Sequence, residues 1–248
     1  MIRLSVNVNK VATLRNARGG DVPSVLEAAR VCIDAGAPGI TVHPRADERH
    51  ITARDVRELA DLLAPLEGRV EFNIEGDPRP DLLALVRAVV PDQCTIVPVQ
   101  PGEITSQAGW PADLPPDDMR RIVDDLRALG VRVSLFVDPE AAAVDWAARA
   151  GADRVELYTE PFARAFHAGG SALQQSIERY TAAAGRAHDL GLVVNAGHDL
   201  DLANLPVFRR VPHVAEVSIG HALISRALFV GLGRVVREYL DVLSGATP

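Results

Sequence analysis

The chain has 248 residues, of which 48% are hydrophobic and 4% aromatic, and its formal net charge is −7 at pH 7. This negative charge argues against a general nucleic-acid binder, which would carry a basic face, and it leaves a small anionic substrate in a local basic pocket as the expected ligand. No apolar run approaches the roughly 20 residues that cross a bilayer, and the N-terminal MIRLSVNV lacks the regions of a secretory signal. We therefore expect a cytoplasmic protein without membrane or nucleic-acid partners. Cys32 and Cys94 have no CxxC spacing and are expected to be buried free thiols.

Strand and helix patterns alternate along the chain, which predicts βα units and a parallel sheet. The expected strands are 4–8, 40–42, 70–74, 94–97, 131–137, 154–158, 192–195 and 215–219. The expected helices are 24–36, 53–63, 81–90, 117–129, an Ala-rich run to 150, 173–190, a short turn after the seventh strand, and one helix from 221 to about 243. The segment before 173, through Phe162, His167 and Gly170, is expected to be a loop. Eight such units without a linker predict the α/β class and a single-domain TIM (β/α)8 barrel over residues 1–248.

In such a barrel the chemistry gathers at the C-terminal ends of the strands. The stretch GITVHPRADERH shows the pattern most clearly, because a buried strand leads into His43, Arg45 and His50. The alternative interpretation is a polar loop before a helix, since Thr52 to Asp55 resembles a capping box. The candidates at strand ends, with one in the long 100–116 connection, are Asn7, Asn9, Lys10, His43, Arg45, His50, Glu75, Thr105, Glu156, His198, Gly220 and His221.

Two segments are typical of phosphate-binding turns. NAGHD and IGHALIS each place a glycine beside a polar residue after a strand, and the second opens a helix whose free N–H groups favour an anion. Arg18, together with Arg15 and Asn16, could donate hydrogen bonds to a second anion, although a solvated loop arginine is the simpler alternative.

His43, Glu75 and His198 are the acid–base candidates, because partial burial tunes such groups toward neutral pH. The same residues could hold a metal, but neither a His-x-His pair nor HExxH is present, so no metal is expected. Glu156, inside a strand facing the barrel interior, is costly to bury without a cation or a hydroxyl, and we interpret it as a stabiliser of developing positive charge.

Lys10 is the only lysine beside 25 arginines, and it follows the first strand. A Schiff-base aldolase or lyase that uses Lys10 as the nucleophile on a ketose phosphate is therefore the alternative enzymatic hypothesis. A phosphosugar-binding barrel without catalysis is a further alternative, which the joint presence of His43, Glu75 and His198 disfavours.

The whole chain also resembles the pyridoxine 5'-phosphate synthase family. The resemblance rests on VNVNKVATLRNARG, AGAPGITVHPRADERHIT, FNIEG, VSLFVD, VELYT, VNAGHDL and SIGHALISRAL, in this order. It implies condensation of 3-amino-2-oxopropyl phosphate with 1-deoxy-D-xylulose 5-phosphate to pyridoxine 5'-phosphate, inorganic phosphate and water, without a cofactor. It also implies a homo-oligomer, either a dimer or an octamer.

The resemblance further implies a role for each candidate. His43 and Glu75 would be general bases, His198 a general acid and Glu156 a transition-state stabiliser. The residues implied to hold the amino-ketone phosphate are Asn7, Arg18, Gly220 and His221. Those implied to hold the deoxyxylulose phosphate are Arg45, His50 and Thr105, the last on a loop that would close as a lid.

The chain departs from the family pattern in two segments. Many members have Asp-His where this chain has Asn9-Lys10, and a glycine where Asp199 follows His198. We expect Lys10 to replace the histidine as a cationic donor to substrate, and Asp199 to offer its backbone N–H to phosphate.

Overall fold

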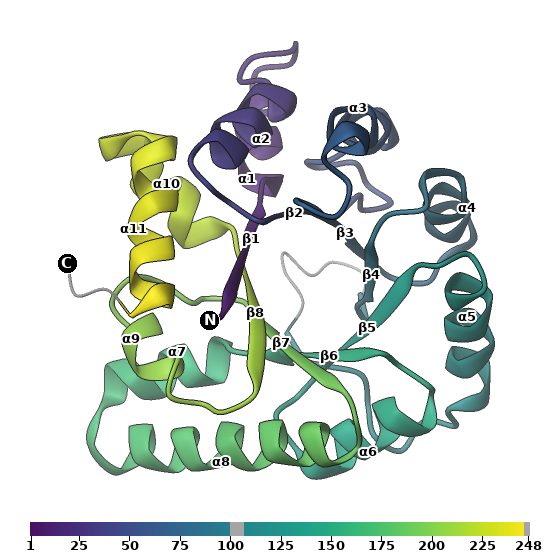
Figure 1. The fold of residues 1–248 in the computed structure, drawn as a ribbon, viewed down its shortest axis with the longest axis vertical. Helices are drawn as coiled ribbons and strands as arrows, with labels where there is room; N and C mark the ends of the chain where they lie inside the picture. The colour runs from purple at the N-terminus through teal and green to yellow at the C-terminus, as the bar shows by residue number, and fades with distance from the viewer. Residues whose placement is uncertain (100–106, 246–248) are drawn as a thin grey trace.

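The chain forms a closed barrel of eight parallel strands that follow one another in sequence order (Figure 1). The computed structural model describes residues 1–99 and 107–245. The strands are β1 (Arg3–Asn7), β2 (Gly39–Val42), β3 (Glu71–Gly76), β4 (Gln93–Ile96), β5 (Arg132–Val137), β6 (Arg154–Tyr158), β7 (Val193–Gly197) and β8 (Val214–Ile219). The predicted TIM barrel is thus confirmed.

The helices form a ring outside the strands (Figure 1). They are α1 (Asn9–Asn16), α2 (Val25–Asp34), α3 (Ala53–Leu63), the 3-10 turn η1 (Ala64–Leu66), α4 (Pro80–Val89), α5 (Asp117–Arg127), α6 (Ala141–Arg149), α7 (Glu160–Ala168), α8 (Gly170–Asp189), α9 (Leu205–Phe208), α10 (His221–Val230) and α11 (Leu232–Ser244). The capping box predicted at Thr52 and Asp55 is present in full at the start of α3. Within the described residues, no helix has the length and hydrophobicity that crossing a membrane requires.

Three segments differ from the sequence expectations. The predicted loop before residue 173 contains α7, which begins with Pro161 in its first turn and is separated from α8 by Gly169, at φ 68°. The predicted single C-terminal helix is broken at Gly231, whose φ of 89° lies outside the helical region. The polar stretch after β1, which was not predicted to be regular, is the short helix α1.

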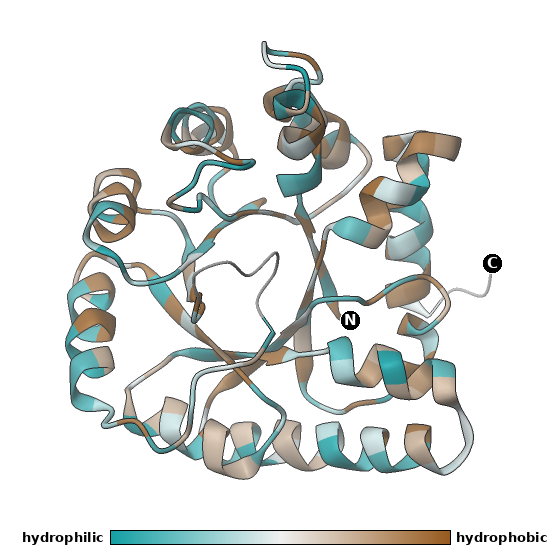
Figure 2. Ribbon diagram, turned by 180° about the vertical axis from the view of Figure 1, so that it is seen from behind, coloured by the Kyte–Doolittle hydropathy of each residue, from teal (hydrophilic) through white to brown (hydrophobic). Residues whose placement is uncertain are grey.

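The hydrophobic core lies between the strands and the helices, where side chains such as Leu4, Ile40 and Ile74 are completely buried. Hydrophobic residues therefore occupy the strands and one stripe of most helices (Figure 2). Cys32 and Cys94 are buried and free, as predicted.

The interior of the barrel is polar, which is unusual for a fold whose lumen is ordinarily filled by branched apolar side chains. Ser5 Oγ lies 2.6 Å from Thr41 Oγ1, Asn73 Nδ2 donates to Thr41 at 3.3 Å, and Thr95 Oγ1 donates to Asn73 at 3.1 Å. These bonds join β1 to β4 beneath the mouth of the barrel.

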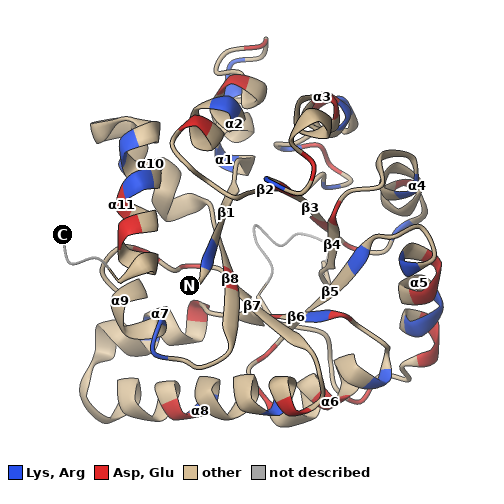
Figure 3. Cartoon of the chain, viewed as in Figure 1, with Lys and Arg blue, Asp and Glu red and all other residues tan. Residues whose placement is uncertain are grey.

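The opposite end of the barrel carries a charge cluster. Glu71 lies 2.6 Å from Arg132 and 3.6 Å from both Arg3 and Arg154. Other charges of both signs are spread over the outer helices (Figure 3). The polar interior therefore connects two charged ends, of which only the C-terminal one opens into the pocket described next.

Candidate active site

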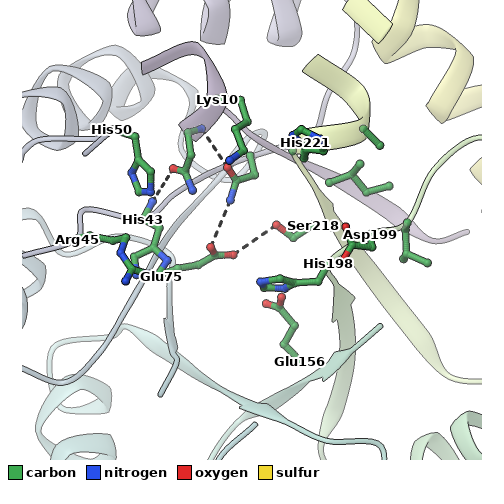
Figure 4. A pocket seen from close by; sticks show the side chains of 16 residues that line it. Lys10, His43, Arg45, His50, Glu75, Glu156, His198, Asp199, Ser218 and His221 are labelled. Atoms are coloured by element: carbon green, nitrogen blue, oxygen red, sulfur yellow. Dashed lines mark hydrogen bonds between the residues drawn. The ribbon is translucent and has the colours of Figure 1, made fainter. Parts of the chain in front are cut away.

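A pocket of about 300 Å³ lies at the C-terminal ends of the strands (Figure 4). It is lined by Asn7, Asn9, Lys10, His43, Arg45, His50, Glu75, Glu156, His198, Asp199, Leu200, Ser218, Ile219, Gly220, His221 and Ala222. Every described residue predicted for the site lines this pocket except Arg18. Segments far apart in sequence meet because every parallel strand of the barrel ends at the same rim.

Glu75, near the end of β3, occupies the centre of the pocket (Figure 4). Asn7 Nδ2 donates to its Oε2 at 3.3 Å, and Ser218 Oγ donates to its Oε1 at 3.5 Å. Burial, together with the charge of Glu216, raises the pKa of Glu75 to about 8, although the Ser218 bond opposes this shift. The carboxyl group therefore titrates near neutral pH, where a general acid–base group is most effective.

His43 follows β2 and is held by its backbone, because its N–H donates to Asn9 Oδ1 at 2.9 Å. Its buried Nε2 has no hydrogen-bond partner among the described residues. Burial first, and then the charges of His50 and Arg45, lower its pKa well below the ordinary value. His43 is thus a neutral imidazole with a free ring nitrogen in a pocket, which is what a general base requires.

His50 is fixed by its own main chain, since the N–H of Ile51 donates to its Nδ1 at 2.9 Å. This acceptor role leaves the proton on Nε2, so the ring can donate a hydrogen bond without carrying charge. Burial, followed by the charge of Lys10, lowers the pKa of His50 to about 4. Together, Lys10, Arg45 and His50 form a donor-rich corner of the pocket.

The opposite side of the pocket holds His198, with the carboxyl group of Glu156 beneath its ring (Figure 4). Burial lowers the pKa of His198 to about 4, against the opposing effects of Asp199 and the Gly197 carbonyl. Burial, with the charges of Glu75 and Glu216, raises the pKa of Glu156 well above its ordinary value. Burial therefore favours the uncharged form of both side chains.

Gly197 allows this arrangement. A Cβ at that position would lie 2.2 Å from Glu156 Oε1, closer than any real contact. The other glycine of the site, Gly220, precedes α10 and packs against Asn7, where a Cβ would lie 3.0 Å from the backbone oxygen. The start of α10, with His221 as its first residue, provides a second corner where an anion can approach free N–H groups.

The donor set predicted around Arg18 is not formed. Arg15 instead donates to Asp55 Oδ1 at 2.5 Å and Oδ2 at 2.9 Å, while Asn16 Nδ2 donates to the carbonyl oxygen of His50 at 2.9 Å. Helix α1 turns both residues toward α3, and Arg18 is exposed beyond its end. Thr105 lies outside the described residues.

Ser218, which contacts Glu75 from β8, was not among the residues predicted for the site. Its only sequence signal is a polar residue two positions before Gly220 in a strand that is otherwise apolar at its end. Within the described residues, no group of three His, Cys, Asp or Glu side chains is arranged to hold a metal ion.

Comparisons with solved structures agree with the fold. The chain aligns over 98% of its length with a structure titled "Native KDPGal structure", at a TM-score of 0.61 and 12% identity, covering 95% of that chain. It aligns over 99% of its length with all of phosphoribosyl anthranilate isomerase from Thermotoga maritima, at a TM-score of 0.61 and 13% identity. At such low identity, these matches indicate a shared barrel and nothing finer.

Comparisons with sequences are more specific. Residues 4–245 match the family model described as "Pyridoxal phosphate biosynthesis protein PdxJ". The chain is 51% identical over 244 residues to pyridoxine 5'-phosphate synthase of Bacteroides fragilis, which covers 98% of this chain and all of the relative. It is 50% identical to the same enzyme of Porphyromonas gingivalis, again over 98% of this chain and all of the relative. The chain therefore belongs to the pyridoxine 5'-phosphate synthase family of vitamin B6 biosynthesis enzymes.

Proposed function

We propose that the pocket condenses 3-amino-2-oxopropyl phosphate with 1-deoxy-D-xylulose 5-phosphate, giving pyridoxine 5'-phosphate, inorganic phosphate and water. The observation that carries this proposal is the grouping of His43, Glu75 and His198 between two corners that can each accept an anion. Two phosphorylated substrates need two such corners, and ring closure between them needs several proton transfers.

The sugar phosphate is proposed to bind at Lys10, Arg45 and His50, and the amino-ketone phosphate at the start of α10. Lys10 and Arg45 supply charge to the first corner, and the neutral His50 supplies an oriented N–H. At the second corner, Gly220 lets the backbone approach the oxygens closely. Asn7, Asn9 and Asp199 also line the pocket. Asn7 is proposed to help hold the amino-ketone phosphate, Asp199 to offer its backbone N–H to phosphate, and Asn9 to contact substrate. Arg18 and Thr105 keep their proposed substrate roles from the family resemblance.

The proton transfers are assigned from the ionisation of the free site. His43, neutral and without a partner at Nε2 among the described residues, is proposed to take a proton from the attacking amine or its adduct. Glu75 is proposed as the second base, which acts in its ionised form. Burial favours the protonated form of Glu156, which lies beside His198. Passing a proton from Glu156 to His198 would create both the general acid and the carboxylate that stabilises positive charge, and the negative charge of bound phosphate favours the imidazolium form of His198.

A direct assay tests the proposal. The purified protein is incubated with both substrates without added metal or nucleotide, and pyridoxine 5'-phosphate and free phosphate are followed by chromatography. We expect both products, and we expect Glu75→Gln and His198→Ala to lower kcat by about 10²- to 10⁴-fold. The matched controls, Glu178→Gln and His213→Ala, change exposed residues outside the pocket and should retain full activity.

Borohydride reduction in the presence of the sugar phosphate distinguishes the proposed synthase from the Schiff-base aldolase. Because Lys10 is the only lysine, a reduced adduct on its side chain is readily located by peptide mass spectrometry. Turnover without an adduct supports the synthase, in which the imine forms between the substrates. A Lys10 adduct without pyridoxine 5'-phosphate would instead establish the Schiff-base aldolase.

A further inference from the structure

The turn after β7 has an unusual backbone. His198 has φ 80° and the next residue, Asp199, has φ 58°, so two consecutive non-glycine residues adopt the left-handed conformation. Side chains with a Cβ rarely adopt this conformation, and it persists where surrounding structure imposes it. The position of the His198 imidazole depends on this turn.

Two buried side chains hold three consecutive carbonyl oxygens of the turn. Thr159 Oγ1 donates to the Gly197 oxygen at 2.6 Å and is also within hydrogen-bond reach of the His198 oxygen. Asn204 Nδ2 donates to the Asp199 oxygen at 3.0 Å. Both Thr159 and Asn204 are completely inaccessible to solvent. The backbone of the turn is therefore fixed on the protein side, away from the pocket.

The hydroxyl group of Thr159 is not used in the ordinary way. Thr159 is the N-cap residue of α7, where a threonine side chain would normally accept a hydrogen bond from the first turn of its helix. No such bond is formed, and the hydroxyl donates across to the β7 turn instead. The backbone N–H of Thr159 also donates to the Gly197 oxygen, at 2.9 Å. The Thr159 hydroxyl therefore does not cap α7, and it bonds instead to the segment that carries His198.

Aromatic residues at the ends of β5 and β6 pack against the imidazole of His198. The centroid of the His198 ring lies 4.9 Å from that of the Phe136 ring and 5.5 Å from that of the Tyr158 ring. Tyr158 is the residue before Thr159. Tyr158 is itself held, because its backbone oxygen accepts a bond from the hydroxyl of Tyr180. The end of β6 thus contacts both the backbone and the ring of His198, and Phe136 of β5 packs against the same ring.

We propose that Thr159 and Asn204 are positioning residues, which we call the β7-turn clamp, that hold His198 in place for proton transfer. This inference rests on the proposed role of His198 and adds residues that touch neither substrate. Loss of the clamp would let the turn relax toward ordinary backbone angles and move the imidazole away from Glu156. Lys10, Arg45, His50 and the start of α10 would stay in place.

Thr159→Val tests the clamp, because it removes the hydroxyl and keeps the shape of the side chain. We expect kcat to fall about 10- to 100-fold, since a displacement of about 1 Å at a catalytic group has an effect of this size. The KM values for both substrates should change much less than kcat, because Lys10, Arg45, His50 and the start of α10 lie on other segments. Thr159→Ser, which restores the donor, should recover most of kcat. The matched control is Thr13→Val, which removes a hydroxyl that donates to the Asn9 oxygen within α1.

The NMR titration of the His198 ring gives a readout that a general loss of stability would not produce. In Thr159→Val we expect the pKa of His198 to rise from about 4 toward the ordinary imidazole value of 6.5, because the ring leaves its buried position. Thr159→Cys, with a weak donor of similar size, should be intermediate and is available if the valine variant does not fold. Unchanged kcat and unchanged His198 titration in a folded valine or cysteine variant would overturn the clamp.

Failure of the clamp and failure of the proposed function give different results. If the wild-type protein makes no pyridoxine 5'-phosphate, the proposed reaction fails. In that case the His198 titration and a crystal structure of Thr159→Val still decide whether the turn depends on the hydroxyl. If the wild-type protein is active and Thr159→Val is equally active with a left-handed His198, only the clamp is refuted.

Discussion

At the scale of single residues, the site depends on side chains that burial keeps uncharged. Glu156, His43 and His198 are all surrounded by protein, and their pKa values move toward the neutral form as desolvation requires. An uncharged imidazole can take a proton, and a protonated carboxyl group can supply one. The free pocket therefore contains both proton acceptors and a proton donor, which a ring-closing condensation requires.

Gly197→Ala tests how closely this arrangement is built. The new Cβ would overlap Glu156 Oε1 at 2.2 Å, so the carboxyl group must move away from His198. We expect kcat to fall about 100-fold and the free energy of unfolding to fall by about 1 to 3 kcal/mol. Steady-state kinetics and urea denaturation measure the two effects. Gly185→Ala is the control, because its Cβ meets nothing within 4 Å on α8 and alanine favours a helix. A Gly197→Ala enzyme with normal kcat would show that Glu156 has no role at this position.

At the scale of elements, a salt bridge joins α1 to α3 next to the pocket corner formed by Lys10, Arg45 and His50. Arg15 forms a bidentate pair with Asp55, whose carboxylate also completes the capping box of α3. Arg15 and Asn16 both donate to the backbone oxygen of His50, at 3.2 and 2.9 Å. The helices thus fix the loop that presents His50 to the pocket, and residues predicted to bind an anion are used to build its binding site.

Arg15→Ala should therefore affect both stability and binding. It leaves Asp55 buried without its cation, and we expect the free energy of unfolding to fall by about 3 kcal/mol. Because His50 loses support, the KM for the sugar phosphate should rise more than the KM for the amino ketone. Arg54→Ala removes an exposed pair with Glu58, which water screens, and should leave stability almost unchanged. Equal effects of the two variants would contradict a structural role for the Arg15 pair.

At the scale of the whole molecule, the polar barrel interior links folding to pH. Burial is the main reason that the pKa of Glu75 rises to about 8 and that of Glu216 to about 7, so the folded chain holds protons that the unfolded chain loses near pH 4.5. These groups stabilise the fold at low pH, and the contribution falls as pH rises toward 8. His50 and His198, with pKa values near 4, have the opposite effect between pH 4 and 6.5. The two effects offset each other below pH 6.5, and only the carboxyl effect remains above it.

Stability should therefore decrease between pH 6.5 and 8. Glu75 alone would contribute a decrease of about 2 kcal/mol over this interval. Urea denaturation at several pH values measures the slope for the wild type, for Glu75→Gln and for the exposed control Glu178→Gln. We expect the glutamine at position 75 to flatten the slope and the control to leave it unchanged. If the free energy of unfolding of Glu75→Gln still falls with pH as in the wild type, groups other than Glu75 cause the decrease.

The assembly of the protein also belongs to this scale. Leu228 and Phe229 on α10 are 67% and 88% exposed in the single chain. Large apolar side chains side by side on one helix support the proposed homo-oligomer, because burial in an interface would remove them from water. Sedimentation of the wild type and of Phe229→Glu would measure the association.

The sequence by itself determined the barrel and most of its rim. The alternation of strand and helix patterns sets the order of the elements, and polar residues directly after apolar strands, such as His43 and His198, mark the end at which the strands open. A local pattern suffices here because a parallel barrel brings all strand ends to one rim. The motifs that carry the family resemblance are also short segments at these strand ends, so they too can be recognised in the sequence.

Only the tertiary structure decided which polar residues serve the pocket and which support it. Arg15 and Arg18 look alike in sequence, yet Asp55, distant in the chain, engages the first and not the second. The roles of Ser218 and Thr159 cannot be read from their neighbours in sequence, since their partners Glu75 and Gly197 lie on other strands. The protonation of Glu75, Glu156 and His198 follows from burial, which depends on the packing of the whole barrel. Contacts and desolvation of this kind depend on distances between remote segments, and such distances exist only once the chain has folded.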